Sequence, residues 1–251
     1  MPTERIALVT GANQGVGLEV ATKLAAHDVT VYVGSRDLGR GEVAAGGIGA
    51  GATAIQLDVT DLASVAAAAD RIRTEHGRLD LLVNNAGISN TQQGSLTPDE
   101  MAATSTASQA SLDEVRAIWD VNVFGVLAVY QAMLPLLRAS ADARIVNVSS
   151  GVGSLASNAD PSFPYRSIYG PGYAASKTSE NAMTMAMMIE LEPTDIKINL
   201  VSPGFTSTAL NNFAGTESLA EGSREVVRVA LLGPDGPTGT FTRWENATIP
   251  W

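Results

Sequence analysis

Residues 6–17 of the chain read IALVTGANQGVG, a short apolar run followed by a turn with three glycines. The run Ile6–Thr10 is too short for a helix and is typical of a strand covered on both faces. Glycine lets a backbone turn sharply and approach a pyrophosphate, whose charge then lies at the amino terminus of the next helix. The spacing is G-x-x-x-G-x-G rather than G-x-G-x-x-G, so the turn alone is also compatible with a merely tight connection.

The rest of the chain alternates short apolar runs with segments of helical period. The runs lie at Val29–Val33, Ala54–Leu57, Leu79–Val83, Arg144–Val148, Ile196–Val201 and Gly239–Thr242, and the helical segments at Val16–Ala26, Leu62–Glu75, Leu112–Arg138 and Tyr173–Glu192. Three stretches look irregular: Gly39–Gly51, Ser89–Ser111 and Gly151–Gly172. The alternation predicts one α/β domain over residues 1–251, a Rossmann-type doubly wound parallel sheet of about seven strands with helices on both faces.

Composition excludes several function classes. The net charge of −10 argues against nucleic acid, because a phosphate-backbone partner needs a positive surface. There is no cysteine, which excludes disulfides, thiolate catalysis and cysteine zinc sites, and we expect no metal. Only His27 and His76 carry an imidazole, so a general acid is not expected to be histidine. No leader is evident, and no apolar run approaches the roughly 20 residues of a bilayer span, so we expect a cytoplasmic protein without membrane partners.

Four further motifs follow the glycine turn TGANQGVG (10–17). They are LDVT (57–60), NNAG (84–87), NVSS with YAASK (147–150 and 173–177), and SPGFTST (202–208). In this order they resemble the short-chain dehydrogenase/reductase family, from Thr3 to the carboxyl terminus. The ending GPTGTF…PW, with GSRD after the second run, is similar to the carbonyl-reductase branch. The resemblance implies an oxidoreductase that passes hydride between a nicotinamide dinucleotide and a carbonyl or alcohol.

The resemblance also implies a cofactor site spread along the chain. It assigns Asp58 and Val59 to the adenine, residues 84–87 to a wall beside the nucleotide, and residues 203–208 to the nicotinamide carboxamide. The residue types fit, since a carboxylate accepts from an amine and threonines offer hydroxyls. A helix cap at Asp58 and a simple turn at Pro203–Gly204 remain open alternatives. The expected contacts are Gly11, Asn13, Gln14, Gly15, Val16, Gly17, Ser35, Arg36, Asp58, Val59, Asn84, Ala86, Gly87, Tyr173, Lys177, Pro203, Gly204, Thr206 and Thr208.

The resemblance makes a tyrosine the catalytic acid. A phenol with an ordinary pKa near ~10 needs a nearby cation, and Tyr173 has a lysine four residues later, Lys177, on the same helix face. Tyr165 and Tyr169 lack a lysine at that spacing. A solvated tyrosine–lysine pair is the structural alternative.

Two further side chains complete the expected catalytic set. Ser150, the second serine of NVSS, is expected to bind the substrate oxygen, with Ser149 as its rival. Asn122 matches an asparagine that holds a water in relatives, and its structural alternative is a local helix kink.

Cofactor preference depends on the end of the second run. Uncharged Ser35 stands where NAD-specific relatives tend to have an acid, and Arg36 follows it. A guanidinium clasps a 2′-phosphate with two donors, so we favour NADP(H), with NAD(H) still possible. Asp37 partly neutralises this site, and Gln14 stands in the glycine turn where many relatives have a basic residue.

The stretch Ser89–Thr106 and segments 151–172 and 205–222 are expected to shape the substrate pocket. They have no cluster of basic residues, which favours a small neutral carbonyl or alcohol. Whether the chain is a monomer or a homo-oligomer stays open. The rival in another class is a non-catalytic NAD(P)-binding sensor or scaffold. A second rival is an epimerase or dehydratase, although about forty residues after SPG leave little room for the longer substrate domain of such enzymes.

Overall fold

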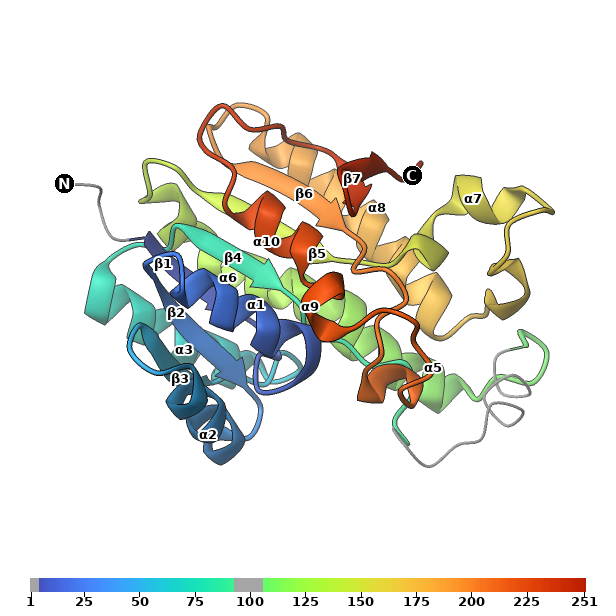
Figure 1. Cartoon of the computed structure of the whole chain (residues 1–251), viewed down its shortest axis with the longest axis horizontal. Coiled ribbons are helices and arrows are strands. Elements are labelled where there is room, and N and C mark those ends of the chain that lie inside the picture. Colours follow the sequence, from blue (N-terminus) through green and yellow to red (C-terminus); the bar gives the residue numbers. More distant parts are fainter. Residues whose placement is uncertain (1–4, 93–105) are drawn as a thin grey trace.

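The computed structural model of the chain describes residues 5–92 and 106–251. Its sheet has the order β3-β2-β1-β4-β5-β6-β7-β8 (Figure 1). The strands are β1 (Arg5–Val9), β2 (Val29–Ser35), β3 (Ala52–Gln56), β4 (Leu81–Asn84), β5 (Arg144–Val148), β6 (Lys197–Val201), β7 (Phe241–Arg243) and β8 (Ala247–Thr248). Neighbouring strands from β3 to β7 pair in parallel, and β8 pairs antiparallel with β7. The predicted doubly wound sheet is confirmed, with the short hairpin strand β8 in addition.

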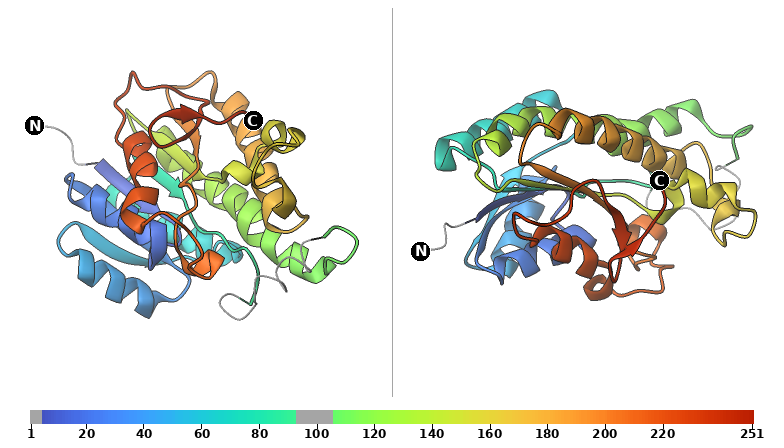
Figure 2. Two further views of the ribbon diagram at one scale, coloured as in Figure 1. Left: turned by 45° about the vertical axis from the view of Figure 1, so that its right-hand side comes forward. Right: turned by 90° about the horizontal axis from the view of Figure 1, so that it is seen from above.

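Helices cover both faces of the sheet (Figure 2). They are α1 (Gly15–Ala25), α2 (Leu38–Ile48), α3 (Leu62–His76), α5 (Leu112–Trp119), α6 (Gly125–Arg138), α7 (Leu155–Ala159), α8 (Tyr173–Leu191), α9 (Leu219–Gly222) and α10 (Arg224–Ala230). Core residues of α3, α6 and α8 pack on one face, and those of α1, α2 and α10 on the other. The strand period of two explains both layers, because Ile6 and Leu8 of β1 join the first core while Ala7 and Val9 join the second.

The prediction that Gly39–Gly51 is irregular was wrong, because most of it forms α2. The glycines of this segment lower its helix propensity, but packing against the sheet stabilises the helix nonetheless. Asp37 caps the helix by accepting from the Arg40 amide, and Ala44 and Ala45 are buried against the sheet. Small residues suit this position, since a Cβ on Gly41 would lie 3.0 Å from the Cβ of Ser35.

The predicted segment Leu112–Arg138 is helical throughout, but a π-helical turn, η1 (Asp120–Phe124), joins α5 to α6. By length and composition this helix could cross a membrane, which contradicts the expectation that no apolar run approaches a span. Half of its most apolar window is buried in the protein. Val129 and Met133 lie in the core, so packing accounts for the apolar composition.

Segment 151–172 is not wholly irregular. It contains the 3-10 turn η2 (Gly151–Gly153), the short helix α7 and a second 3-10 turn, η3 (Arg166–Ile168). Part of the stretch Ser89–Ser111, which was also expected to be irregular, lies outside the described residues. The segment after β6 adds a third short helical turn, η4 (Ala209–Asn211), before α9.

Candidate active site

The glycine turn follows β1 and opens directly into α1. Gly11 and Gly15 have positive φ, and a Cβ on Gly17 would lie 2.3 Å from Asn85 Nδ2 and 2.7 Å from the Gly11 carbonyl oxygen. A side chain at Gly11 or Gly17 would therefore displace the neighbouring loop, and the positive φ of Gly11 and Gly15 favours glycine at both positions. The turn thus leads directly into the amino terminus of α1, and the free amide groups of such a helix end are of the kind that binds a pyrophosphate.

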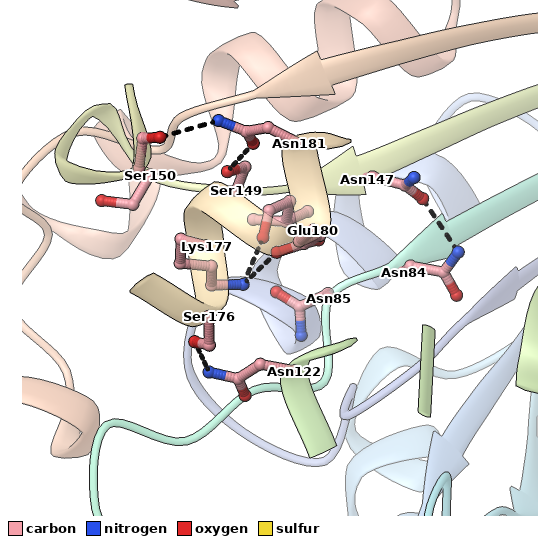
Figure 3. Close-up of polar contacts among 12 residues, drawn as sticks. Asn84, Asn85, Asn122, Asn147, Ser149, Ser150, Ser176, Lys177, Glu180 and Asn181 are labelled. Carbon is pink, nitrogen blue, oxygen red and sulfur yellow. Dashed lines mark hydrogen bonds and ion pairs between the residues drawn. The ribbon is translucent and has the colours of Figure 1, made fainter. Parts of the chain in front are cut away.

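The NNAG loop after β4 is fastened to this turn. The Thr10 hydroxyl accepts from the amides of Asn85 and Ala86, at 2.9 Å each, and Asn85 Nδ2 donates to the carbonyls of Thr10 and Gly11. Asn84 points the other way. Its side chain is buried and donates to Asn147 of β5 at 2.9 Å, so any contact of residue 84 with a nucleotide has to come from its backbone (Figure 3).

The expected catalytic residues meet at the carboxyl ends of β4 and β5. Lys177 Nζ lies 5.9 Å from the centroid of the Tyr173 ring, and a Cβ on Gly87 would lie 3.6 Å from Nζ and 3.4 Å from Asn122 Oδ1. Tyr173 begins α8, and Ser150 follows β5. The parallel sheet thus brings together four residues, from Asn122 to Lys177, that are up to 55 positions apart in the sequence.

Tyr173 is partly buried, and its surroundings act on the pKa of its phenol in opposite directions. Burial raises the pKa of Tyr173 above its ordinary value, the charge of Lys177 lowers it, Glu180 raises it, and a hydrogen bond with Ser150 lowers it. The net direction is upward, so the Lys177 charge moderates the effect of burial without reversing it. A phenol of this kind stays protonated near neutral pH and is able to donate its proton.

Geometry separates the two serines. Ser149 is buried and donates to Asn181 Oδ1 at 2.6 Å, which occupies its hydroxyl (Figure 3). Ser150 is less buried, caps η2 by accepting from the Val152 amide at 3.4 Å, and lies close enough to Tyr173 to lower the pKa of its phenol. This arrangement favours Ser150 as the residue that faces a substrate.

The competing tyrosines have other partners. The Tyr169 hydroxyl lies 2.9 Å from the Thr178 hydroxyl, and the Tyr165 ring stacks against Phe163 and Phe205. Neither has a lysine one helical turn later.

Asn122 lies fully buried inside η1. Its Oδ1 accepts from the Ile88 amide at 2.9 Å, and its Nδ2 donates to the Ile88 carbonyl and to Ser176, each at 2.9 Å. The structural alternative for Asn122 was a local irregularity of the helix, and the π-helical turn η1 is such an irregularity. Asn122 also contacts the loop at Ile88, so both features are present.

The expected adenine end lies beyond β2 and β3. Ser35 is buried and donates to the Asp37 carbonyl at 2.6 Å, whereas Arg36 is exposed. Asp58 Oδ1 accepts from the amide and the hydroxyl of Thr60. The alternative that Asp58 caps the next helix was wrong, because Asp61 is the N-cap of α3. Val59 is buried beside α6, where a Cβ on Gly125 would lie 2.8 Å from a Val59 methyl.

The segment after β6 folds back over the glycine turn. The Thr208 methyl lies 3.9 Å from the position of a Cβ on Gly15. Pro203 and Gly204 form a turn in which the Thr206 hydroxyl donates to the Pro203 carbonyl at 2.7 Å and Gly204 has positive φ. Thr208 caps η4. The turn alternative at Pro203–Gly204 is thus present, and Thr208 lies beside the glycine turn, while the nicotinamide contact of this segment stays a prediction.

A cavity of about 560 Å³ lies within segment 151–172, lined by Leu155, Asn158, Ala159, Arg166 and Tyr169. Neither Ser150 nor Tyr173 is among its lining residues. We therefore place the chemistry by the catalytic side chains and not by this cavity. Across residues 5–92 and 106–251, no group of three or more His, Cys, Asp or Glu side chains is placed to hold a metal ion.

Sequence reasoning missed Glu180. Its side chain is 1% exposed, and its Oε2 lies 2.7 Å from Lys177 Nζ, an ion pair three residues apart on α8 (Figure 3). The helix-face rule that paired Tyr173 with Lys177 also reaches position 180, and this signal would have found it. Asn85 was expected only as part of the backbone wall at residues 84–87, whereas its side chain binds the glycine turn.

The fold and the site define a dinucleotide-binding α/β protein. Comparison with known proteins specifies the class further, since the sequence model of the short chain dehydrogenase family matches residues 5–218. A short-chain dehydrogenase of Penicillium roqueforti is 34% identical over 98% of this chain and 97% of its own, and the salutaridine reductase of Papaver bracteatum is 30% identical over 94% and 93%.

Two solved structures show the same fold at full length. NADPH-bound carbonyl reductase from chicken has a TM-score of 0.79 at 25% identity, covering 99% of both chains. The 3-ketoacyl-(acyl-carrier-protein) reductase of Brucella melitensis, in complex with NADH, has a TM-score of 0.78 at 25% identity and covers 96% of both chains. The chain belongs to the short-chain dehydrogenase/reductase family of oxidoreductases, which bind nicotinamide cofactors.

Proposed function

We propose that this protein is an NADP(H)-dependent, carbonyl-reductase-like enzyme that reduces a small neutral carbonyl compound, with Tyr173 as the acid. The observation that carries the proposal is the meeting of Tyr173, Lys177 and Ser150 beside the NNAG loop, with Lys177 Nζ 5.9 Å from the centroid of the Tyr173 ring. A purely binding protein has no use for a serine and a charged lysine around one phenol.

The residues present fit a nicotinamide dinucleotide. The cradle formed by Gly11, Gly15 and Gly17, a tight turn with positive φ at Gly11 and Gly15 that opens into α1, would hold the pyrophosphate. Asp58 and Val59 would contact the adenine, Asn84, Ala86 and Gly87 would form a backbone wall, and Pro203 to Thr208 would receive the nicotinamide. The other proposed contacts are Asn13, Gln14, Val16, Ser35, Arg36 and Lys177. When bound, the cofactor would supply the hydride.

The chain's own residues would provide the proton chemistry. Ser150 Oγ would donate a hydrogen bond to the substrate carbonyl oxygen and stabilise the charge that develops there. The Tyr173 hydroxyl would give its proton to that oxygen as hydride reaches the carbon. The Lys177 ammonium would stabilise the phenolate that Tyr173 leaves behind. Asn122 would keep the loop at Ile88 in place beside Lys177.

The preference for NADP(H) is supported by the end of β2. Asp37 was expected to neutralise part of the charge of Arg36. Its carboxylate instead caps α2 by accepting from the Arg40 amide at 3.0 Å. The Arg36 side chain is exposed, and its guanidinium would offer two donors to a 2′-phosphate. One of the two compared structures holds NADPH and the other NADH, so the proposed preference for NADP(H) depends on Arg36 alone.

The test is a spectrophotometric screen of NADPH and NADH with aldehydes, ketones, quinones and diketones, on the parent and on Tyr173→Phe. We expect NADPH-dependent reduction of neutral carbonyl compounds by the parent, lost in the variant. Tight dinucleotide binding without turnover of any substrate would favour the sensor or scaffold instead. Reduction of acidic substrates alone would contradict the substrate class, for which segments 151–172 and 205–222 are the proposed walls.

A further inference from the structure

The buried Glu180 carboxylate is not part of the mechanism above. Its side chain is 1% exposed, and that of Lys177 is 5% exposed, so their ion pair is shielded from water. Glu180 Oε2 receives the Lys177 ammonium at 2.7 Å. Glu180 Oε1 is buried with no hydrogen-bond partner among the described residues. Since a buried carboxylate is unfavourable unless it is paired, Lys177 is its main source of stabilisation.

Lys177 is held from a second side as well. Its Nζ donates to the carbonyl of Val148, at the end of β5, at 2.9 Å. An ammonium has three N–H groups, so two are engaged and one remains for the site in front of it. Glu180 and Val148 together set the direction of the lysine side chain.

The same pairing changes the charge that Tyr173 experiences. The ends of β4 and β5 and the turns η1 and η2 present neutral groups here, among them Asn122, Ser149 and Ser150. Among the described residues, the charges that act on Tyr173 are those of Lys177 and Glu180, in opposite directions. Glu180 also raises the pKa of Lys177 above its ordinary value, although burial acts to lower it.

We propose that Glu180 is a positioning residue that holds Lys177 and neutralises part of its charge, so that Tyr173 is a weaker acid and remains protonated near neutral pH. This inference rests on the proposed function and specifies it. A phenol that stays protonated serves carbonyl reduction, whereas alcohol oxidation needs the phenolate. The pair therefore favours the reductive direction at neutral pH.

The experiment is an ultraviolet titration of phenolate absorption without cofactor or substrate. Tyr173 is isolated by subtracting the same titration in a Tyr173→Phe background. Glu180→Gln keeps an acceptor for Lys177 but removes the charge, and we expect it to move phenolate formation at Tyr173 down by about one pH unit. Glu180→Met, which replaces the carboxylate with an apolar side chain, should move it in the same direction, and thermal unfolding checks that both variants fold.

Glu192→Gln is the matched control, because Glu192 is exposed at the end of the same helix and carries the same charge. It should leave the Tyr173 titration unchanged. No shift in either Glu180 variant would show a carboxyl that is already neutral, and an upward shift would show that Glu180 mainly keeps Lys177 protonated. Both results overturn the inference. The titration needs no turnover, so it distinguishes this failure from a failure of the proposed activity.

A kinetic readout follows if the enzyme is active. In Glu180→Gln, alcohol oxidation at neutral pH should rise several-fold relative to the parent, while the rate of carbonyl reduction changes little, because the phenol already carries its proton in the parent. A Glu180→Gln variant that loses both rates in equal proportion would indicate a structural role only.

Discussion

The side-chain amide of Asn122 is bound at both ends to the backbone of one residue, Ile88. Its Oδ1 accepts from the Ile88 amide and its Nδ2 donates to the Ile88 carbonyl, each at 2.9 Å. The side-chain amide of Asn122 thus satisfies both backbone groups of Ile88, just beyond the NNAG loop, as a neighbouring strand would. Because Asn122 lies in the π-helical turn η1, the irregular helix and the loop beside Lys177 are fixed to each other.

Asn122→Asp should weaken this connection. The carboxylate still accepts from the Ile88 amide but no longer donates to the Ile88 carbonyl or to Ser176, and it places a charge in a buried site. We expect a loss of about 1–3 kcal/mol in the free energy of unfolding, measured with denaturant, together with reduced turnover. A variant as stable and as active as the parent would mean that these hydrogen bonds do not hold the site.

Gly17→Ala should disturb the glycine turn, because the new Cβ would lie 2.3 Å from Asn85 Nδ2 and 2.7 Å from the Gly11 carbonyl oxygen. We expect a loss of about 1–3 kcal/mol in stability and weaker dinucleotide binding, measured by fluorescence titration. Gly46→Ala is the control, since nothing lies within 4 Å of its added Cβ in α2. It should stabilise the protein by roughly 0.5–1 kcal/mol and leave binding unchanged. Equal effects of the two substitutions would contradict the cradle.

Arg36→Ala should discriminate between the two cofactors. If Arg36 clasps the 2′-phosphate, NADPH binding weakens by roughly 1–3 kcal/mol while NADH binding barely changes. Binding is measured by titration of each reduced cofactor. Arg40→Ala serves as control and should change neither affinity, because Arg40 is also exposed and lies in the first turn of α2. Equal losses for NADPH and NADH would show that Arg36 is structural.

Tyr173→Phe should keep dinucleotide affinity and lower turnover by orders of magnitude, since it removes one hydroxyl and keeps the ring. The matched control is Tyr130→Phe, which removes a hydroxyl paired with Glu190 outside the proposed pocket and should leave turnover unchanged. Steady-state kinetics and cofactor titrations on both variants make the comparison. Turnover that survives in Tyr173→Phe would remove Tyr173 from the mechanism.

Lys177→Met should produce two losses together. The apparent pKa of alcohol oxidation should move upward, because the charge that favours the phenolate is gone, and cofactor binding should weaken if the same ammonium holds the nicotinamide ribose. A pH–rate profile at saturating cofactor measures the first effect and a binding titration the second. Weaker binding with an unchanged profile would leave Lys177 as a ribose contact only.

The same variant leaves Glu180 buried without its cation, and burial raises the pKa of the Glu180 carboxyl above its ordinary value. A group whose folded pKa is raised stabilises the protein fully at acid pH and loses that contribution as the pH rises. Denaturant unfolding should therefore show a deficit that grows from acid toward neutral pH, to about 3–5 kcal/mol. Adding Glu180→Met to Lys177→Met should restore stability without restoring turnover, and a deficit independent of pH would contradict this account.

Much of the fold could be predicted because its signals are local. The seven predicted strands are all present, with ends that differ by no more than two residues, since buried parallel strands read as short apolar runs. The helix α2 was missed because its glycines lower local helix propensity, while the packing of Ala44 and Ala45 against the sheet supplies what propensity lacks. The short helices α7, α9 and α10 lack the length for a periodic signal.

The sequence by itself determined which residues could carry the chemistry: the glycine turn, the tyrosine with a lysine one helical turn later, and the serine pair at a strand end. These are patterns of neighbours along the chain, and propensity and period act on neighbours. Only the tertiary structure decided that Ser149 is engaged by Asn181 while Ser150 meets Tyr173, and that Lys177 has a buried carboxylate behind it. Burial and the pairing of distant segments set which charges are shielded from water, and that shielding determines how strongly Lys177 and Glu180 act on Tyr173.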